Sequence, residues 1–253
     1  MKFAGIDIGS RSIELAVVDE KGELLETHQT DTGFDPIPRA RKLLDEVEYD
    51  SIMATGYGRT LFEIAFDGAR TVTEIKAHAR GVLASFPEAE TILDIGGQDS
   101  KAIALNAKGR VKKFEMNDRC AAGTGKFLEI MASNLGFSIE EFGRAALETD
   151  RNLAISSMCT VFAESEVTSL IARGADRREI SRGLHLSVVK RASGMINRVS
   201  SQGPIVFSGG VARNPCMVHL LSQSLDREVL VPEDPQMMGA LGAALVLEEE
   251  TPA

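Results

Sequence analysis

Two cysteines lie in settings that suit a reactive or cluster-binding thiol. Cys120 lies in NDRCAAGTGKFLEIMA (117–132), and Cys159 lies in SSMCTVFAESEVTSLIARG (156–174). We expect helices over about 120–134 and about 160–173, with a cysteine at each N-terminus. The unpaired N–H groups and the positive end of the dipole favour negative charge at a helix N-terminus. Such a position stabilises a thiolate, or an anionic cluster that thiolates hold.

The number of cysteines limits what these thiols can bind. The chain has three cysteines and no Cys-x-x-Cys pair, which argues against a structural zinc site. The third, Cys216 in NPCMV, lacks the small-residue setting, and free cysteine is commonly a small buried hydrophobe. An iron–sulfur cluster usually needs four thiolates, and a two-fold homodimer would double two cysteines to four. Two inert buried cysteines are the alternative.

The bulk composition describes an ordinary globular chain. Its 253 residues suffice for one large domain or two small ones, and the net charge of −9 argues against a general nucleic-acid binder. The first ten residues, MKFAGIDIGS, lack the apolar run of a secretory signal, and no apolar stretch would span a bilayer. We therefore expect a cytoplasmic protein with no membrane or nucleic-acid partner.

A glycine turn near the N-terminus has the residues of a phosphate and metal site. We expect strands at 2–8, 13–19 and 23–30 in an antiparallel meander. Asp7 ends the first strand, and Gly9-Ser10-Arg11-Ser12 follows. Backbone N–H groups and the two hydroxyls can face phosphate, and Asp7 can hold Mg²⁺ through water. A plain polar hairpin turn remains the alternative.

The same pattern returns later in the chain. In TILDIGGQDSKAIAL (91–105), an apolar strand again ends in an aspartate, glycines follow, and a second strand starts. ILDIGGQDS echoes AGIDIGSRS, which predicts a duplicated architecture with one hairpin from each copy at a nucleotide cleft. Two unrelated hairpins are the alternative. AAGTGKF is not a P-loop, because its first position is Cys120 and Phe127 replaces the hydroxyl residue.

The remaining pattern predicts elements around these motifs. We expect helices at 36–47, 71–85, 138–147, 177–200 and 236–248, with strands at 51–55 and 204–208. The lone His78 is interpreted as a surface or packed residue, and TGYGRTLF (55–62) as a loop without an assigned role. Gly209 and Gly210 follow the strand at 204–208 and would let the backbone pass close to adenine. The Gly/Ala face of 236–248 suits close packing at an interdomain hinge or a plain buried helix.

We place the domain boundary in the loop 85–88. This gives a first domain of 1–86 plus 236–253, which holds the first glycine turn and the last helix. The second domain, 87–235, holds the second turn, both candidate cluster cysteines and the Gly209-Gly210 segment.

These motifs together resemble a known superfamily. AGIDIGSRSIELAVVD, ILDIGGQDSKAIAL and VFSGGVARNP resemble the phosphate 1, phosphate 2 and adenosine motifs of the acetate kinase/sugar kinase/Hsp70/actin superfamily. With the two cysteine segments, the chain resembles the activator ATPases of 2-hydroxyacyl-CoA dehydratases, also called archerases, and the ATPase subunits of benzoyl-CoA reductase. The resemblance covers almost the whole length.

The resemblance implies a fold, cofactors and site residues. It implies an α/β, two-domain actin-like (ribonuclease H-like) ATPase fold with duplicated mixed sheets around an interdomain nucleotide cleft. It implies a homodimer with one oxygen-sensitive [4Fe-4S] cluster between the subunits, bound by Cys120 and Cys159. ATP and Mg²⁺ would bind in each cleft, with Asp7 holding the ion through water. Nucleotide contacts fall at Gly9, Ser10, Arg11, Ser12, Ile13, Gly96, Gly97, Gln98, Gly209, Gly210 and Gln236. Gln98 or Asp99 would position or polarise the attacking water.

The implied function is ATP-dependent, one-electron donation to a partner iron–sulfur enzyme. A flavodoxin or ferredoxin would reduce the cluster, and a 2-hydroxyacyl-CoA dehydratase would receive the electron. Service to a double-cubane-cluster or benzoyl-CoA-type reductase is an alternative within the family. A metabolite kinase of the same superfamily and a chaperone-like ATP-driven module are the alternatives outside it.

Overall fold

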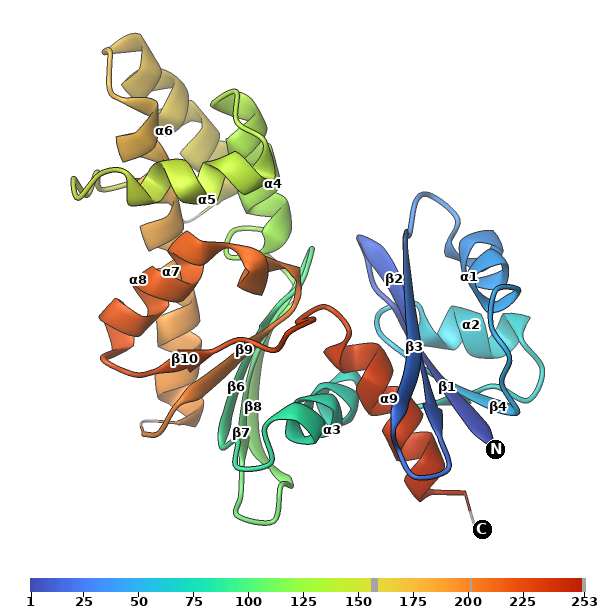
Figure 1. The fold of residues 1–253 in the computed structure, drawn as a ribbon. Helices are drawn as coiled ribbons and strands as arrows, with labels where there is room; N and C mark the ends of the chain where they lie inside the picture. Colours follow the sequence, from blue (N-terminus) through green and yellow to red (C-terminus); the bar gives the residue numbers. More distant parts are fainter. Residues whose placement is uncertain (156–158, 201, 252–253) are drawn as a thin grey trace. The chain divides into compact units, whose positions relative to one another are not determined.

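The computed structural model describes residues 1–155, 159–200 and 202–251 (Figure 1). The first three residues of the Cys159 segment, 156–158, lie outside this description. The strands are β1 (Lys2–Ile8), β2 (Ser12–Asp19), β3 (Leu24–Asp31), β4 (Ser51–Thr55), β5 (Arg70–Thr71), β6 (Thr91–Ile95), β7 (Ser100–Leu105), β8 (Val111–Asn117), β9 (Ile205–Ser208) and β10 (Val229–Leu230). The helices are α1 (Pro36–Leu44), α2 (Arg59–Ala65), α3 (Glu74–Ser85), α4 (Gly125–Asn134), α5 (Ile139–Leu147), α6 (Thr160–Ala172), α7 (Arg177–Val199), α8 (Pro215–Leu225) and α9 (Met238–Glu249), with a 3₁₀ turn η1 (Gly210–Arg213).

The two sheets repeat one topology, so the predicted duplication is confirmed. The first five-stranded sheet has the order β3-β2-β1-β4-β5, and the second, read in the same direction, has the order β8-β7-β6-β9-β10. In the first sheet, β1 pairs antiparallel with β2 and parallel with β4, and β2 pairs antiparallel with β3. The three N-terminal strands therefore form the predicted meander, and both sheets have the same strand order.

The chain divides into two compact units. Unit 1 comprises Met1–Ile92, Ile103–Lys113 and Pro232–Ala253, and unit 2 comprises Leu93–Ala102 and Phe114–Val231. The predicted functional domains, 1–86 with 236–253 and 87–235, stay a prediction.

In unit 1, the two faces of the first sheet are covered by different helices. Ile6 and Ile8 of β1 share a core with Phe62 of α2, and the intervening β1 residues face α9. A methyl group at Gly5 would lie 2.0 Å from the Ala240 carbonyl oxygen, and one at Gly242 would lie 1.8 Å from the Ala77 carbonyl oxygen of α3. The small residues of α9 therefore let the helix backbone contact both β1 and α3. Because every residue of α9 from Met238 to Leu247 is buried, its apolar character all round is expected.

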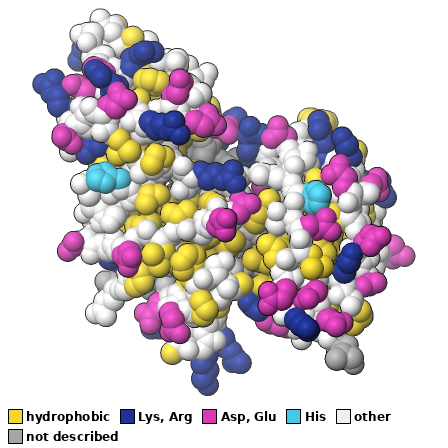
Figure 2. Space-filling model, viewed as in Figure 1, with side chains coloured by type: hydrophobic (Ala, Val, Ile, Leu, Met, Phe, Trp, Pro, Cys, Tyr) yellow, Lys and Arg dark blue, Asp and Glu magenta, His cyan; other side chains and the backbone are white. Residues whose placement is uncertain are grey.

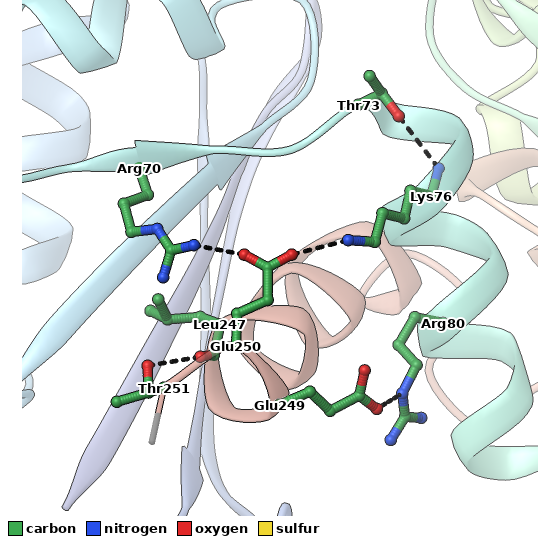
Figure 3. Close-up of polar contacts among 8 residues, drawn as sticks. All are labelled: Arg70, Thr73, Lys76, Arg80, Leu247, Glu249, Glu250 and Thr251. Carbon is green, nitrogen blue, oxygen red and sulfur yellow. Dashed lines mark hydrogen bonds and ion pairs between the residues drawn. The ribbon is translucent and has the colours of Figure 1, made fainter.

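Charged residues fix the C-terminal end of α9. Glu250 pairs with Arg70 and with Lys76, whose Nζ lies 2.8 Å from Glu250 Oε1. Glu249 pairs with Arg80 of α3 (Figure 3). Acidic side chains gather on the surface of unit 1 around the end of α9 (Figure 2).

Unit 2 has its own large core. Phe127, Phe142, Leu184 and Phe207 are buried together and come from α4, α5, α7 and β9. The long α7 packs against both α5 and α8. These helices position the segments that carry Cys120 and Cys159.

Several elements differ from the sequence prediction. Residues 59–65 form α2, although 55–62 was predicted as a loop, and β8 and α8 were not predicted. The most important difference is the start of α4, which begins at Gly125 and not near Cys120. Gly123 has φ +106°, which a right-handed helix does not allow, and Thr124 is extended. Cys120 therefore lies just ahead of the small-residue turn 121–124 and five residues before α4, so the expected helix start near residue 120, with the cysteine at its N-terminus, was wrong.

No helix in the described ranges has the length and apolar character that crossing a bilayer requires.

Candidate functional site

A polar row crosses the first sheet at the end of β1. Asp7 is in register with Glu14 of β2 and with Thr55 of β4, and register partners point to the same face of a sheet. All three side chains are buried. Gln29 of β3 extends the row, because its Nε2 donates to Glu14 Oε1 at 3.1 Å. Two carboxylates and a hydroxyl therefore lie side by side under the first glycine turn.

Two glycines enclose the Asp7 carboxylate. A methyl group at Gly56 would lie 2.2 Å from Asp7 Oδ1, and one at Gly239 would lie 2.0 Å from Asp7 Oδ2. Gly56 also has φ +85°, which favours glycine. His78 of α3 is buried beside them, with Nε2 3.7 Å from Asp7 Oδ2. His78 is therefore a packed residue, as expected, but it packs against a candidate site residue.

The donor set around Asp7 suits Mg²⁺. Carboxylate and hydroxyl oxygens are hard ligands, and Thr55 Oγ1 is buried without a hydrogen-bond partner in the described structure. Across residues 1–155, 159–200 and 202–251, no group of three or more His, Cys, Asp or Glu side chains converges to hold a metal. The ion would therefore need water and phosphate oxygens as its other ligands, which is how Mg²⁺ is commonly bound.

The TGYGR segment, for which the sequence offered no role, braces the first turn. Gly58 N donates to the Ile8 carbonyl at 2.9 Å, and Arg59 Nη1 donates to the Gly56 carbonyl at 3.0 Å. On the other side, Thr32 Oγ1 donates to the Gly9 carbonyl at 2.7 Å. The turn is thus held at its base from both sides.

The turn residues themselves differ in what they present. Ser10 and Arg11 are exposed, and Arg11 forms an ion pair with Asp31 at 2.8 Å. Ser12 starts β2 and is partly exposed. The Ile13 side chain is fully buried in the core, so only its backbone is at the turn.

The second turn has the opposite electrostatics. Asp94 holds the place of Asp7 in the repeated motif, and Lys101, seven residues later, holds the place of Glu14. Lys101 Nζ lies 3.2 Å from Asp94 Oδ2 and 2.7 Å from Asp99 Oδ2, with the lysine side chain only 4% exposed. The first turn therefore has two buried carboxylates, whereas in the second a buried lysine pairs with the corresponding aspartate.

The backbone of the second turn is tightly folded. Gly96 N donates to the Asp99 carbonyl at 3.1 Å. Gly97 is partly exposed, the Gln98 side chain is exposed, and Asp99 is held by Lys101. Gln98 is thus the more accessible of the two predicted catalytic side chains.

The Gly209-Gly210 segment lies directly against this second turn. Ser208 Oγ donates to Asp94 Oδ1 at 2.9 Å. Gly209 has φ +81°, and a methyl group there would lie 2.4 Å from the Ile95 carbonyl oxygen. Gly210 starts η1, after which Asn214 caps α8. The predicted phosphate 2 and adenosine motifs are therefore in contact.

The start of α4 joins the second turn to the Cys120 segment. Gly125 N donates to the Gly96 carbonyl at 2.9 Å, and Lys126 N donates to the Gly97 carbonyl at 2.7 Å. Five residues before α4, the Cys120 carbonyl accepts from Asn117 Nδ2 at 2.9 Å. Two of the N–H groups that the start of α4 leaves without a partner inside the helix therefore donate to carbonyls of the second glycine turn.

The three cysteines have different environments. Cys159 is the N-cap residue of α6, as the sequence predicted, and both Cys159 and Cys120 are partly exposed. Just after Cys159, Val161 and Phe162 are 65% and 69% exposed. Cys216 is fully buried, and desolvation raises the pKa of its thiol to about 12. Cys216 is therefore the inert buried hydrophobe, and the other two are accessible.

The predicted site residues form two groups. Asp7, the turn 9–13 and Gln236 belong to unit 1, and Gln236 lies in the turn before α9. The residues 96–99, Gly209, Gly210, Cys120 and Cys159 belong to unit 2. Sequence reasoning missed Glu14, Thr55 and Lys101. The spacing of seven residues from each motif aspartate was the one available signal for Glu14 and Lys101.

Comparison with known proteins identifies relatives along the full chain. Residues 4–246 match the model of the BadF/BadG/BcrA/BcrD ATPase family. The chain is 42% identical to the activator of lactoyl-CoA dehydratase from Anaerotignum propionicum over 257 residues, covering 98% of each chain. It is 38% identical to the 2-hydroxyisocaproyl-CoA dehydratase activator from Clostridioides difficile over 258 residues, covering 99% of this chain and 96% of the relative.

A solved structure agrees. The activator of the 2-hydroxyisocaproyl-CoA dehydratase from Clostridium difficile, with bound ADPNP, superimposes with a TM-score of 0.90 at 38% identity, covering 99% of this chain and 95% of the other. The α/β fold with two mixed sheets is thus that of the actin-like ATPases, as the sequence predicted. The sequence motifs, the duplicated sheets and these matches lead to one conclusion: the chain belongs to the BadF/BadG/BcrA/BcrD ATPase family.

Proposed function

We propose that the chain is an ATP-dependent, one-electron donor that activates a partner iron–sulfur enzyme, a 2-hydroxyacyl-CoA dehydratase. The relatives named as dehydratase activators, at 38% and 42% identity, support this class of partner. The observation that carries the proposal is the pair of hydrogen bonds from Gly125 and Lys126 to the Gly96 and Gly97 carbonyls. They join a nucleotide turn to a segment with an accessible cysteine.

The nucleotide would be held by the two glycine turns and by the segment 209–214, here called the adenosine loop. Backbone N–H groups of Gly9, Ser10 and Gly97 would face the phosphates, and Gly209 and Gly210 would give room for the adenine. Gly96, whose N–H is bonded to the Asp99 carbonyl, would contact the nucleotide as part of the same turn. Gln236 would complete the nucleotide contacts from the turn before α9. Asp7 would hold Mg²⁺ through water, and Glu14, next to it in register, adds negative charge to the same site.

Hydrolysis needs a positioned water. We assign its positioning to Gln98, whose side chain is exposed at the second turn. Asp99 would accept a hydrogen bond from the same water, while Lys101 keeps its carboxylate in place. The reaction consumes one water and yields ADP and phosphate, so it resets the chain without oxidising or reducing any of its groups.

The thiols of Cys120 and Cys159 suit a shared [4Fe-4S] cluster. Two accessible cysteines per chain supply four thiolates in a two-fold homodimer, and the exposed Val161 and Phe162 beside Cys159 are the kind of residues that such an interface buries. The cluster would supply one-electron chemistry at a low potential. A cluster held at a subunit interface is also expected to be oxygen-sensitive.

Nucleotide binding would act on the electron donor through α4. If phosphate draws the Gly96-Gly97 turn toward it, the first residues of α4 follow, because their N–H groups are bonded to that turn. The potential of an iron–sulfur centre responds to charge, hydrogen bonds and exposure, all of which a shift near Cys120 changes. The electron would come from a flavodoxin or ferredoxin.

Three alternatives remain distinct proposals. A double-cubane-cluster or benzoyl-CoA-type reductase could replace the dehydratase as partner, with the same chemistry in this chain. A metabolite kinase would need an acceptor whose addition accelerates ATP turnover, and a chaperone-like module would bind no iron.

The proposal is tested by anaerobic electron transfer. The chain, reduced with flavodoxin, is mixed with an iron–sulfur dehydratase component, and the reduction of that component is followed with ATP, with ADPNP and without nucleotide. We expect repeated transfer only with ATP, loss of it in Cys120→Ala, and normal transfer in Cys216→Ala. Equal transfer without nucleotide, or ATP turnover that rises with a sugar or acid acceptor, would overturn the proposal.

A further inference from the structure

The adenosine loop (209–214) is held at its end by Asn214, whose partner, the buried His185, lies outside every quoted motif. Asn214 ends this loop and caps α8, with its Oδ1 accepting from Cys216 N at 3.0 Å and from Met217 N at 3.2 Å. Its Nδ2 faces His185 Nε2 on α7, at 2.9 Å. Because the amide oxygen is used by the cap, the Asn214 side chain donates to the imidazole.

The other nitrogen of the ring fixes its protonation. His185 Nδ1 lies 2.7 Å from the Ser181 carbonyl, so it carries the proton and donates. Ser181 Oγ donates in turn to the Phe142 carbonyl of α5 at 2.8 Å. His185 is fully buried and packs against Phe142 with the rings tilted by 41° and their centroids 4.6 Å apart. Desolvation lowers the pKa of His185 to about 4, so the ring is neutral near pH 7 and can accept from Asn214.

Helix α5 also packs against the Asn214 side chain. A methyl group at Gly143 would lie 2.4 Å from Asn214 Oδ1 and 2.8 Å from its Cγ. The Asn214 side chain is therefore confined between Gly143, His185 and the first turn of α8, and each of its polar atoms has a partner. A hydrogen-bonded network of this kind, with His185 and Ser181 fully buried, specifies one geometry for the backbone that carries it.

From this geometry we infer that His185 is a positioning residue for the nucleotide: through Asn214 it holds the loop 209–214 in the conformation that receives the adenosine group. The inference rests on the proposed nucleotide function of that loop. His185 touches no nucleotide and takes no part in hydrolysis. Its effect is to keep the loop in the binding conformation before the ligand arrives, which lowers the cost of ordering it on binding.

The inference predicts an effect confined to the base and sugar of the ligand. In His185→Leu the ring is replaced by an apolar side chain, and Asn214 Nδ2 loses its acceptor. We expect the Kd for ADPNP to rise about tenfold or more, whereas the Kd for inorganic tripolyphosphate changes less than twofold. The kcat for ATP hydrolysis should stay within about twofold at saturating ATP, while KM rises with the Kd. A general loss of structure would instead weaken both ligands.

Matched variants separate the contact from the substitution. His185→Gln can still accept from Asn214 and should fall between the wild type and His185→Leu. Gly143→Ala acts on Asn214 from α5 without changing α7 and should reproduce the selective loss for ADPNP. His219→Gln, on the exposed face of α8, and Gly194→Ala, whose methyl group has 3.7 Å to its nearest neighbour, are the controls and should bind both ligands as the wild type does.

The geometry has an independent readout. In protein with ¹⁵N-labelled histidine, the His185 signals should be those of a neutral ring protonated at Nδ1, and Asn214→Asp should protonate both nitrogens by placing a carboxylate at Nε2. A wild-type chain that binds no ADPNP would overturn the proposed function and this inference with it. A wild type that binds ADPNP while His185→Leu and Gly143→Ala bind it equally well would overturn the inference alone, as would equal losses for ADPNP and tripolyphosphate.

Discussion

The two glycine turns differ in one charged residue, and this difference suits them to different roles. The repeated motif places an acid at Glu14 in one copy and a base at Lys101 in the other, seven residues after each aspartate. In unit 1 the result is a pair of buried carboxylates that attract a cation. In unit 2 the lysine compensates Asp94 and holds Asp99. One duplicated turn therefore suits a metal ion, and the other suits the chemistry at a phosphate.

Replacement of Lys101 should be costly. Lys101→Met leaves Asp94 buried without its cation, and breaking a buried pair in this way costs about 3–5 kcal/mol of unfolding free energy. Lys2→Met removes the exposed pair with Glu48 and should cost less than about 1 kcal/mol. Urea denaturation of both variants measures the difference. Similar small losses in the two variants would mean that the Asp94–Lys101 pair is not buried as described.

The protonation of His185 should make stability depend on pH. Its pKa is lowered from 6.5 to about 4 in the folded chain, mainly by desolvation, so the unfolded chain binds the proton first as the pH falls. The stability present above pH 6.5 is therefore lost progressively between pH 6.5 and 4, and the total is about 3 kcal/mol at 1.36 kcal/mol per pKa unit.

Denaturation midpoints of the wild type and of His185→Gln across this pH range test the dependence. The variant lacks the titrating ring, so its stability should fall less steeply between pH 6.5 and 4. Parallel curves would show that other groups cause the acid sensitivity.

At the scale of elements, sequence periodicity predicted most strands and helices correctly, and local backbone chemistry explains the failures. The buried strands β1, β6 and β9 are short apolar runs that lead into glycine turns, so their positions could be predicted from the sequence. The edge strand β8, VKKFEMN, is largely exposed and has no alternation that marks one buried face. The start of α4 was misplaced because Gly123 adopts a positive φ that the composition of AAGTG does not reveal.

The candidate site was predictable where a motif is continuous and not where contacts join distant residues. Asp7, Cys159 and the glycine turns stand in local patterns. Thr55 meets Asp7 only through strand pairing, and His185 meets Asn214 across 29 residues of sequence. These partners depend on tertiary packing, which no short window of sequence contains.

Close packing, more than charge, should hold α9 in place. Gly242→Ala would bring a methyl group 1.8 Å from the Ala77 carbonyl oxygen, so α9 must move away from α3, and we expect a loss of about 3 kcal/mol or more. Glu250→Gln weakens the ion pairs with Arg70 and Lys76 at the partly exposed end of the helix and should cost less than about 1 kcal/mol.

Thermal and urea unfolding of these two α9 variants show whether close packing or charge contributes more to holding α9 in place. The Glu250→Gln loss should shrink further in high salt, because salt screens exposed charges. A larger loss for Glu250→Gln than for Gly242→Ala would mean that charge dominates the docking of α9.

For the whole molecule, the proposed activity requires each chain to link a nucleotide turn to accessible thiols. Unit 2 contains such a link, because the first N–H groups of α4 donate to the Gly96 and Gly97 carbonyls of the second turn. The adenosine loop joins the same turn through the hydrogen bond from Ser208 Oγ to Asp94 Oδ1. Cys216 is packed in the same core and is excluded from ligation by its burial.

The central claim is that Cys120 and Cys159 bind a [4Fe-4S] cluster shared by a homodimer. The most direct test is to measure iron and acid-labile sulfide per chain and to record a visible spectrum without oxygen. We predict about two irons and two sulfides per chain, hence four per homodimer, and a charge-transfer absorption that dithionite bleaches. Cys120→Ala and Cys159→Ala should lose the iron but keep ADPNP binding, and Cys216→Ala should retain both. An iron-free chain that hydrolyses ATP and resists reconstitution, or equal iron in all three variants, would contradict the account.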